Sequence, residues 1–383
     1  MAMRANPLLV ENLARYGAGD VSKCYHCGNC TATCHLSHEP FIFPRRAMRA
    51  LQMGLEGRLR SGLEPWLCYY CGECSEQCPR GADPGETMMS MRRWLTAQYD
   101  FTGIAKLFYR SWKSQIVVML AIALLTGLGF VLNALHTGAS LSVYDGAQAF
   151  MPESAVHVFD WTMAFVLVVL LTVNCVRMWH FTMRSEHSVS APILEYLRQV
   201  ALLPFHFFTQ RRYAQCTSKR PWAIHLVLML SYVSMFALVV FFLGDLQHGP
   251  EVRWRVHALG YLAAIGLVTA GTLAFRSRLK HEAPHHKHSY GSDWIFLGTL
   301  LFLAVTGIVQ HVLHRTGLPM AANFAYLVHL MGVASFEITQ VPFGKWSHLA
   351  YRPLAIYFAK IQQAAQAATA TSIEKSMAPL RAS

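Results

Sequence analysis

Apolar residues follow two different patterns along this chain. Up to about residue 110 they occur singly or at helical spacing among polar residues, whereas from Ile116 onward they form long runs. A helix needs about 20 mostly apolar residues to cross the hydrocarbon core of a bilayer. Six runs come close to that length, which predicts membrane-spanning helices at 116–135, 159–176, 222–244, 256–275, 294–313 and 324–343.

The part of the chain before these runs is polar enough to form a soluble head. In the segment 44–62, apolar residues recur at helical spacing. They follow a proline that suits a helix N-terminus and precede a closing glycine. The residues of this predicted helix are Pro44, Met48, Leu51, Leu55, Leu59 and Gly62. A second helix is predicted from about Thr87 to Gln98. The pattern therefore predicts an all-α chain, with a helical domain at 1–110 followed by a six-helix transmembrane bundle at 111–383.

Composition agrees with a membrane protein, since 54% of the 383 residues are apolar and 14% are charged. The net charge of +12 does not indicate nucleic-acid binding, because the basic residues are scattered in the head and then concentrate in two loops between predicted spans. Those loops contain Arg177, Arg184, Arg198, Arg211, Arg212, Lys219 and Arg220, and Arg276, Arg278, Lys280 and Lys287. We therefore expect the chain to lie in membrane lipid and not to bind nucleic acid.

The same charges predict the orientation in the membrane. Residues 136–158, the first loop between spans, contain no Lys or Arg. By the positive-inside rule, both termini and the head are then cytoplasmic. Residues 1–22 lack the continuous apolar core of a signal peptide, which agrees. The segment 192–208 is apolar but interrupted by Glu195 and Arg198, and we expect it to lie along the membrane interface.

Eight of the ten cysteines stand in the head, in two copies of one spacing. The copies are Cys24, Cys27, Cys30 and Cys34, and Cys68, Cys71, Cys74 and Cys78 followed by Pro79. This C-x2-C-x2-C-x3-C run is typical of ferredoxins with two [4Fe-4S] clusters, in which the fourth cysteine of each run binds the other cluster. We therefore assign Cys24, Cys27, Cys30 and Cys78 to one cluster, and Cys68, Cys71, Cys74 and Cys34 to the other.

Two other interpretations of the cysteines fit less well. Zinc ribbons separate two CxxC pairs by a long gap instead of packing four cysteines into eleven residues. Disulfides are disfavoured because no secretory signal precedes the motif. The remaining cysteines, Cys175 and Cys216, have no sequence partner and are interpreted as ordinary buried or loop thiols.

Several of the nineteen histidines fall inside or at the ends of the predicted spans. A histidine within a membrane helix is costly and usually functional, and haem b needs two on facing helices. By depth, His180, His225 and His348 belong to the cytoplasmic side; His157, His257, His311, His314 and His329 belong to the outer side. Hydrogen-bonded or interfacial roles are at least as plausible for His157, His180, His311 and His314.

Two polar features have open interpretations. Glu337 lies within the last span, where it could serve as a quinone-linked proton group or be a neutral acid hydrogen-bonded between helices. His285, His286 and His288 have metal-like spacing, but no other ligand accompanies them, so a solvated loop is the preferred interpretation.

The head resembles the C subunit of heterodisulfide reductase over about residues 8–98. The resemblance rests on Lys23-Cys-Tyr-His-Cys-Gly-Asn-Cys-Thr-Ala-Thr-Cys34, on Trp66-Leu-Cys-Tyr-Tyr-Cys-Gly-Glu-Cys74 and on Cys78-Pro79. It departs from that family at His35, where the family usually has proline. The resemblance implies an α-helical dicluster ferredoxin domain.

The last span resembles the final helix of the nitrate reductase gamma subunit family, through Val328-His329-Leu330 and Val341-Pro-Phe-Gly-Lys-Trp-Ser-His348. In that family two histidines on this helix each bind a haem. The two here are 19 residues apart, so Pro342 must bend or rephase the helix. The resemblance implies a cytoplasmic-side haem between His225 and His348. It implies an outer haem at His329. The family has its second ligand ten residues after the position of His225, where this chain has Met235, so we expect His257 to substitute, with Met235 as the alternative.

A head of this kind fused to such a cytochrome b resembles the C subunits of quinone-interacting membrane-bound oxidoreductases, which link menaquinone to adenylylsulfate reductase in dissimilatory sulfur metabolism. The resemblance implies an electron-transfer subunit in the cytoplasmic membrane of a bacterium or archaeon, with one or two haems b and menaquinone or ubiquinone as substrate. No Rossmann GxGxxG, P-loop or hydrolytic triad is present, so flavin chemistry would belong to soluble flavin and iron-sulfur partner subunits.

Two alternatives remain from the sequence. One is the iron-sulfur and haem subunit of a tricarballylate or citrate utilisation system, which delivers electrons from a flavin dehydrogenase to quinone. The other is a membrane redox sensor without turnover.

Overall fold

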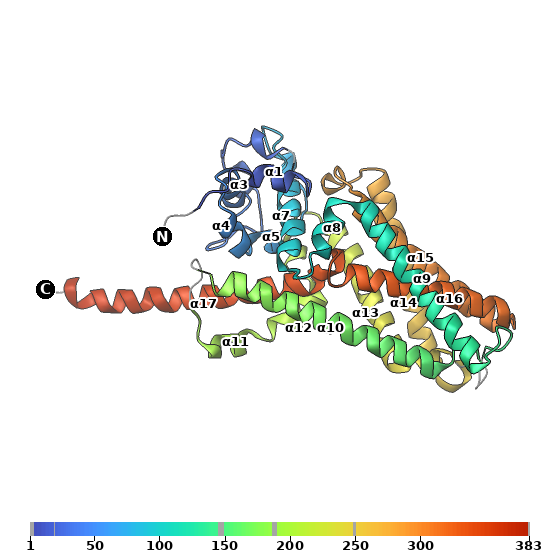
Figure 1. The fold of residues 1–383 in the computed structure, drawn as a ribbon. Helices are drawn as coiled ribbons and strands as arrows, with labels where there is room; N and C mark the ends of the chain where they lie inside the picture. The colour runs from blue at the N-terminus through green and yellow to red at the C-terminus, as the bar shows by residue number, and fades with distance from the viewer. Residues whose placement is uncertain (1–3, 19, 145–148, 186–189, 248–249, 382–383) are drawn as a thin grey trace.

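The computed structural model of the chain describes residues 4–18, 20–144, 149–185, 190–247 and 250–381, and these residues form helices and loops without a named strand. Figure 1 shows a head of short helices beside a bundle of long ones. The predicted all-α fold is confirmed.

The head is built around one central helix, α7 (Pro84–Tyr99), of which nearly every residue is buried. Asp83 caps its N-terminus by accepting a hydrogen bond from the Glu86 backbone, and Pro84 occupies the first turn, where a missing N–H costs nothing. The other head elements are α1 (Leu9–Ala14), η1 (Val21–Lys23), α2 (Asn29–Ala32), α3 (Arg45–Gln52), α4 (Glu56–Ser61), α5 (Glu64–Leu67), α6 (Glu73–Glu76) and α8 (Ile104–Arg110).

The single helix predicted between the cysteine runs is two helices, α3 and α4. The chain turns between them at Gly54, which has a φ of +71°. A Cβ at this position would stand 2.5 Å from the Asn6 carbonyl oxygen, so the close approach of the N-terminal segment requires glycine here. The helical spacing of apolar residues is real, but the break is imposed by a distant segment.

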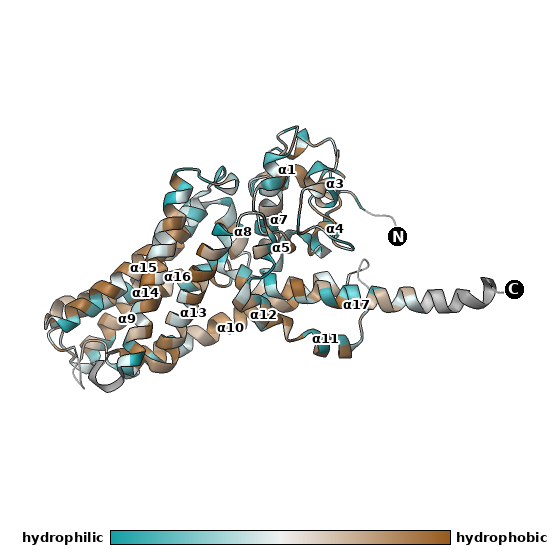
Figure 2. Cartoon of the chain, turned by 180° about the vertical axis from the view of Figure 1, so that it is seen from behind, coloured by the Kyte–Doolittle hydropathy of each residue, from teal (hydrophilic) through white to brown (hydrophobic). Residues whose placement is uncertain are grey.

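Six helices are long and apolar enough to cross a membrane in the part of the chain that the structure describes. They are α9 (Trp112–Thr137), α10 (Glu153–Met183), α13 (Arg220–Gln247), α14 (Pro250–Leu279), α15 (Gly291–Arg315) and α16 (Pro319–Gln340). Large apolar side chains such as Leu125 and Phe241 remain exposed on their outer faces, where lipid would cover them. In Figure 2 much of the ribbon of these long helices has the brown colour of hydrophobic residues. The six predicted spans are confirmed.

The last span does not continue to His348 as a bent helix. It ends at Gln340, Pro342 follows without an N–H to donate, and a short link with η4 (Lys345–Ser347) leads to a separate helix, α17 (His348–Arg381). The Gln340 side chain accepts a hydrogen bond from the Lys345 backbone and so closes this link. Pro342 therefore ends the helix instead of rephasing it, and His348 starts a new one.

Basic residues at the ends of the spans and in the loops between them hold the head in place. Arg177 on α10 donates to the Tyr99 and Gln98 carbonyls at 2.8 and 3.1 Å. Between α10 and α13 lie α11 (Ile193–Gln199), α12 (Leu202–Thr209) and η2 (Tyr213–Gln215); η3 (Pro284–His286) lies between α14 and α15. Tyr99 is also contacted by α17, where Tyr351 packs its ring on Tyr99 and on Trp66, all three almost fully buried. The loops with the predicted cytoplasmic charges are thus the ones that contact the head.

Candidate electron-transfer site

The two cysteine runs fold as copies of one loop. His26 and Tyr70, two residues after the first cysteine of each run, both have a φ of 58°. Gly28 and Gly72 then adopt φ values of +92° and +93° and cap the short helices α2 and α6. These left-handed positions turn the chain so that the following cysteine points back toward the preceding ones.

The thiols of the two runs are interleaved. The thiols that act electrostatically on Cys30 are Cys24, Cys27 and Cys78, and those that act on Cys34 are Cys68 and Cys71. Burial, with a contribution from these neighbours, raises the pKa of Cys30 to about 11 and that of Cys34 to about 12. Iron binding would replace those protons, because the thiolate is the ligand. Four thiols around each of two centres would form the donor set that a [4Fe-4S] cluster requires, and these neighbours agree with the crossed sets expected from the spacing.

A ninth thiol stands beside these cysteines. Cys216, which is 2% exposed, follows η2 and hydrogen-bonds to Cys71. This contact lowers the pKa of Cys71 and raises that of Cys216. The Thr217 backbone donates to the Glu73 carboxylate at 3.0 Å, and Tyr213 stacks on Tyr69. The expectation that Cys216 lacks a partner is therefore wrong, and no sequence spacing relates it to the cysteine runs.

His225 of α13 and His348 of α17 face each other, with ring centroids 5.9 Å apart. Their Nδ1 atoms are both engaged, His225 with the Gln210 side-chain oxygen at 2.8 Å and His348 with the Lys345 carbonyl. Donation from Nδ1 leaves the Nε2 lone pair of each ring free, which is the arrangement of metal-ligating histidines. Burial and the nearby Arg352 hold the pKa of His348 well below its usual value, so the ring is neutral.

The spacing of this pair suits one iron between the two rings. A metal–imidazole bond is about 2 Å and a ring nitrogen lies about 1 Å from its centroid, so two imidazoles that held one metal ion between them would have centroids roughly 6 Å apart. The observed 5.9 Å fits that value. The residues therefore fit a haem with two histidine ligands.

A cavity of about 270 Å³ adjoins the histidine pair. The head contributes Trp66, Tyr69 and Arg92 to its walls, and the bundle and the α16–α17 link contribute aromatic and basic side chains. These are Tyr232, Phe296, Arg278, Lys345, Trp346 and Arg352. Because Tyr69 directly follows Cys68, the cavity reaches from the histidine pair to the second cysteine run.

The histidines predicted for an outer haem are arranged differently. The His329 ring lies 2.9 Å from the Thr306 hydroxyl of α15. His257 of α14 lies beside His311 of α15, with ring centroids 5.6 Å apart. Among the described residues, the buried Nε2 of His257 has no hydrogen-bond partner. Each histidine faces α15, which packs against both α14 and α16. Among the described residues no ring contact joins His257 to His329, so the structure does not bring this predicted pair together.

Glu337 is buried on α16 and 9% exposed. It does not line the cavity; it hydrogen-bonds with Tyr232, which does. Tyr232 in turn packs on Trp346, with ring centroids 3.9 Å apart. Glu337 is thus connected to the cavity through one tyrosine.

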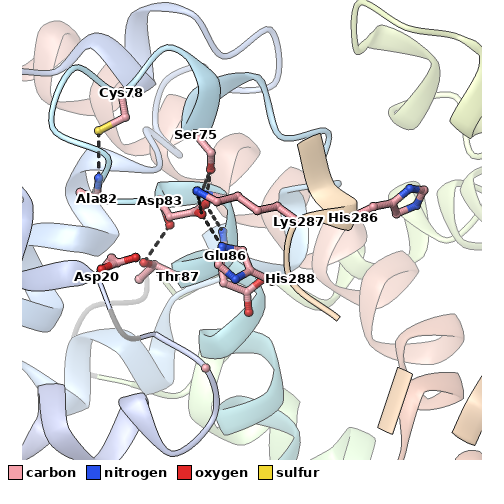
Figure 3. Close-up of polar contacts among 12 residues, drawn as sticks. Asp20, Ser75, Cys78, Ala82, Asp83, Glu86, Thr87, His286, Lys287 and His288 are labelled. Carbon is pink, nitrogen blue, oxygen red and sulfur yellow. Dashed lines mark hydrogen bonds and ion pairs between the residues drawn. The ribbon is translucent and has the colours of Figure 1, made fainter. Parts of the chain in front are cut away.

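The histidine loop between α14 and α15 docks on the head at Asp83 (Figure 3). The Asp83 carboxylate accepts from Ser75 and from His288 Nε2, both at 2.5 Å, and Lys287 lies 3.8 Å away. Burial alone would raise the pKa of Asp83, but these hydrogen bonds hold it below its usual value. His286 is buried and contacts Ser277. The expectation of a solvated loop is wrong for His286 and His288, while the His285 side chain lies outside the described residues.

Comparison with known proteins gives the class of the head. The 4Fe-4S dicluster domain family matches residues 20–82. The E subunit of the dihydromethanophenazine:CoB–CoM heterodisulfide reductase of Methanosarcina thermophila is 26% identical over 196 residues, 46% of this chain and 69% of the relative. Its counterpart in Methanosarcina mazei is 26% identical over 211 residues, 48% and 74% of the two chains.

A protein of Archaeoglobus profundus described as like the C subunit of heterodisulfide reductase is 33% identical over 98 residues, 25% of this chain and 52% of the relative. No solved structure matches the chain.

The domain match and the fold together define a class of protein. The chain carries a dicluster domain for two 4Fe-4S clusters on six apolar helices, and it is a membrane electron-transfer subunit of an oxidoreductase complex. Within that class it is similar to components of heterodisulfide reductases.

Proposed function

We propose that this chain passes electrons between a membrane quinone and soluble flavin and iron-sulfur subunits, by way of haem b and the two clusters. The observation that carries the proposal is the His225–His348 pair, with its centroid spacing of 5.9 Å and two free Nε2 atoms. Haem b would supply one-electron steps between a two-electron quinone and the clusters.

The chain's own residues support a short route for the electron. The histidine pair and Tyr69 line one cavity, and Tyr69 is bonded to the ligand Cys68. We propose that Cys68, Cys71, Cys74 and Cys34 hold the cluster nearer the haem, and that Cys24, Cys27, Cys30 and Cys78 hold the one nearer the soluble partners. The neighbours of Cys30 and Cys34 support these crossed ligand sets.

The quinone end of the route is proposed from the membrane residues. Glu337 would take part in the proton exchange of quinone through its contact with Tyr232. His329 would belong to a second haem toward the other side of the bundle. The proposed orientation places the head in the cytoplasm, since the basic residues that hold it, such as Arg177 near the end of α10 and Arg212, belong to the Lys- and Arg-rich side of the bundle.

The most specific form of the proposal is the C subunit of a quinone-interacting membrane-bound oxidoreductase that serves adenylylsulfate reductase. A heterodisulfide-reductase-type head that precedes a haem-binding bundle supports this form. The similarity to the E and C subunits of heterodisulfide reductases supports a complex with soluble partners.

The histidine pair can be tested in the full chain purified from membranes. His225→Ala and His348→Ala should each abolish the same haem signal, leave the iron-sulfur spectrum intact and stop quinol from reducing the clusters. His180→Ala is the matched control, because His180 is exposed at the end of α10. Retention of haem in both variants, or loss of different haems, would refute the assignment.

A further inference from the structure

Five cationic side chains line the cavity, an unusual number for a buried wall. They are Arg92, Arg93, Arg278, Lys345 and Arg352. A buried charge is costly unless a counter-charge accompanies it, so each of these cations should have a carboxylate partner.

Three of the five cations have such a partner. Arg93 pairs with Glu86 at 2.7 Å, and Arg278 and Lys345 both pair with Asp293. Glu86 and Asp293 are themselves nearly fully buried. Each of these three cations therefore has a carboxylate within ion-pair distance, although Arg278 and Lys345 share one.

Arg92 and Arg352 have no carboxylate partner among the described residues, and the Nε atom of each is buried without a hydrogen bond. Arg92, 7% exposed, donates only to a neutral oxygen, the Cys68 carbonyl at 2.8 Å. The Arg352 guanidinium lies over the Tyr69 ring, 4.2 Å from its centroid. Burial and the like charge of Arg352 lower the pKa of Arg92 to about 10. Two positive charges thus lie close together without compensation.

The position of Arg352 relates these charges to the histidine pair. Arg352 follows His348 by one helical turn on α17, so both side chains lie on one face of that helix. Its charge also acts on both His225 and His348. A group held between the two rings would therefore have one edge beside Arg352 and Arg92.

We propose that Arg92 and Arg352 bind the two carboxylates of the haem that His225 and His348 hold. The proposal rests on the function proposed above. Haem b carries two propionate groups, and a guanidinium is the side chain best suited to pair with a carboxylate. Through its bond to the Cys68 carbonyl, Arg92 then connects the haem edge directly to a ligand of the second-run cluster. The edge of the haem would be turned toward that cluster.

The test is a redox titration of the haem absorbance in the purified full chain. Reduction adds negative charge, so loss of a compensating cation beside a propionate makes reduction harder. Arg352→Gln should retain the haem but shift its one-electron equilibrium about tenfold toward the oxidised form, which is about 59 mV to more negative potential. Arg352→Lys should shift it less, because the charge is kept. Arg49→Gln, which removes an exposed charge on α3, should leave the potential unchanged.

The outcomes separate the two proposals. If His225→Ala and His348→Ala abolish the haem but Arg352→Gln matches Arg49→Gln in potential, the carboxylate site is wrong and the haem assignment stands. If the chain holds no haem at these histidines, both fail. Arg92→Gln serves as a second variant: an unchanged potential in this variant as well would overturn the role of Arg92.

Discussion

The Cys216 thiol hydrogen-bonds to Cys71 although the two residues are far apart in the sequence. Hydrogen bonds to cluster sulfurs stabilise the more negative, reduced state and so raise the reduction potential. We expect Cys216→Ala to lower the potential of the cluster that Cys71 binds by about 40 mV, the equivalent of a hydrogen bond of about 1 kcal/mol. A redox titration followed by electron paramagnetic resonance measures it.

Cys175→Ala is the matched control, because Cys175 is a half-buried thiol on α10 away from the cysteine runs. It should leave both cluster potentials as they are. Equal potentials in the Cys216 variant and in this control would show that the thiol has no influence on the cluster.

Candidate site residues that belong to a sequence motif could be predicted from the sequence. Residues that reach the site from distant segments could not. The eight cysteines follow from their spacing, and His225 and His348 from their depth and from a family resemblance. Cys216 and Arg352 have no pattern of their own, because each gains its neighbours only when a loop or α17 packs on the head. For the same reason the contact of His257 with His311 of α15 could not be predicted from sequence spacing.

At the scale of elements, the turn at Gly54 decides how α3 and α4 pack. An alanine there would be strained at a φ of +71° and would clash with Asn6, so Gly54→Ala should destabilise the chain by about 1–3 kcal/mol. Gly57→Ala, in the exposed first turn of α4 with open space around it, should instead stabilise the chain, by up to about 0.5–1 kcal/mol.

Apparent melting temperatures of the two variants in detergent should therefore move in opposite directions. A Gly54 variant as stable as the Gly57 variant would show that the turn carries no constraint.

The elements that are best predicted from sequence are the long ones. All six membrane helices contain most of their predicted ranges, because each is set by its own apolar run. The sequence does not reveal the break between α3 and α4, because that break depends on the contact with Asn6. It does not reveal α17 either, because this helix is too polar to give a hydropathy signal. Pro342 is visible in the sequence, but whether a proline bends or ends a helix depends on what satisfies the freed groups. Here the Gln340 side-chain oxygen accepts from the Lys345 N–H, a contact that exists only because the chain leaves the helix at this point.

At the scale of the whole molecule, Arg212 connects the membrane half to both cysteine runs. It donates to the Leu36 carbonyl at 2.7 Å and to the Leu67 carbonyl at 3.3 Å, just after Cys34 and just before Cys68. Hydrogen bonds from a charged donor contribute about 1.5–3 kcal/mol each. Arg212→Gln should therefore loosen the head and speed amide hydrogen exchange in peptides around Leu36 and Leu67.

Arg211→Gln removes the same charge from the neighbouring, exposed position. Its exchange pattern should match that of the unaltered chain. Slow exchange around Leu36 and Leu67 in the Arg212 variant would mean that other contacts suffice to hold the head.

The cavity beside His225 and His348 is walled by Trp66, Tyr69 and Arg92 of the head. The haem proposed for this site would therefore be covered in part by the head. Because the head contributes these walls, separating it from the bundle would expose that side of the cavity to water.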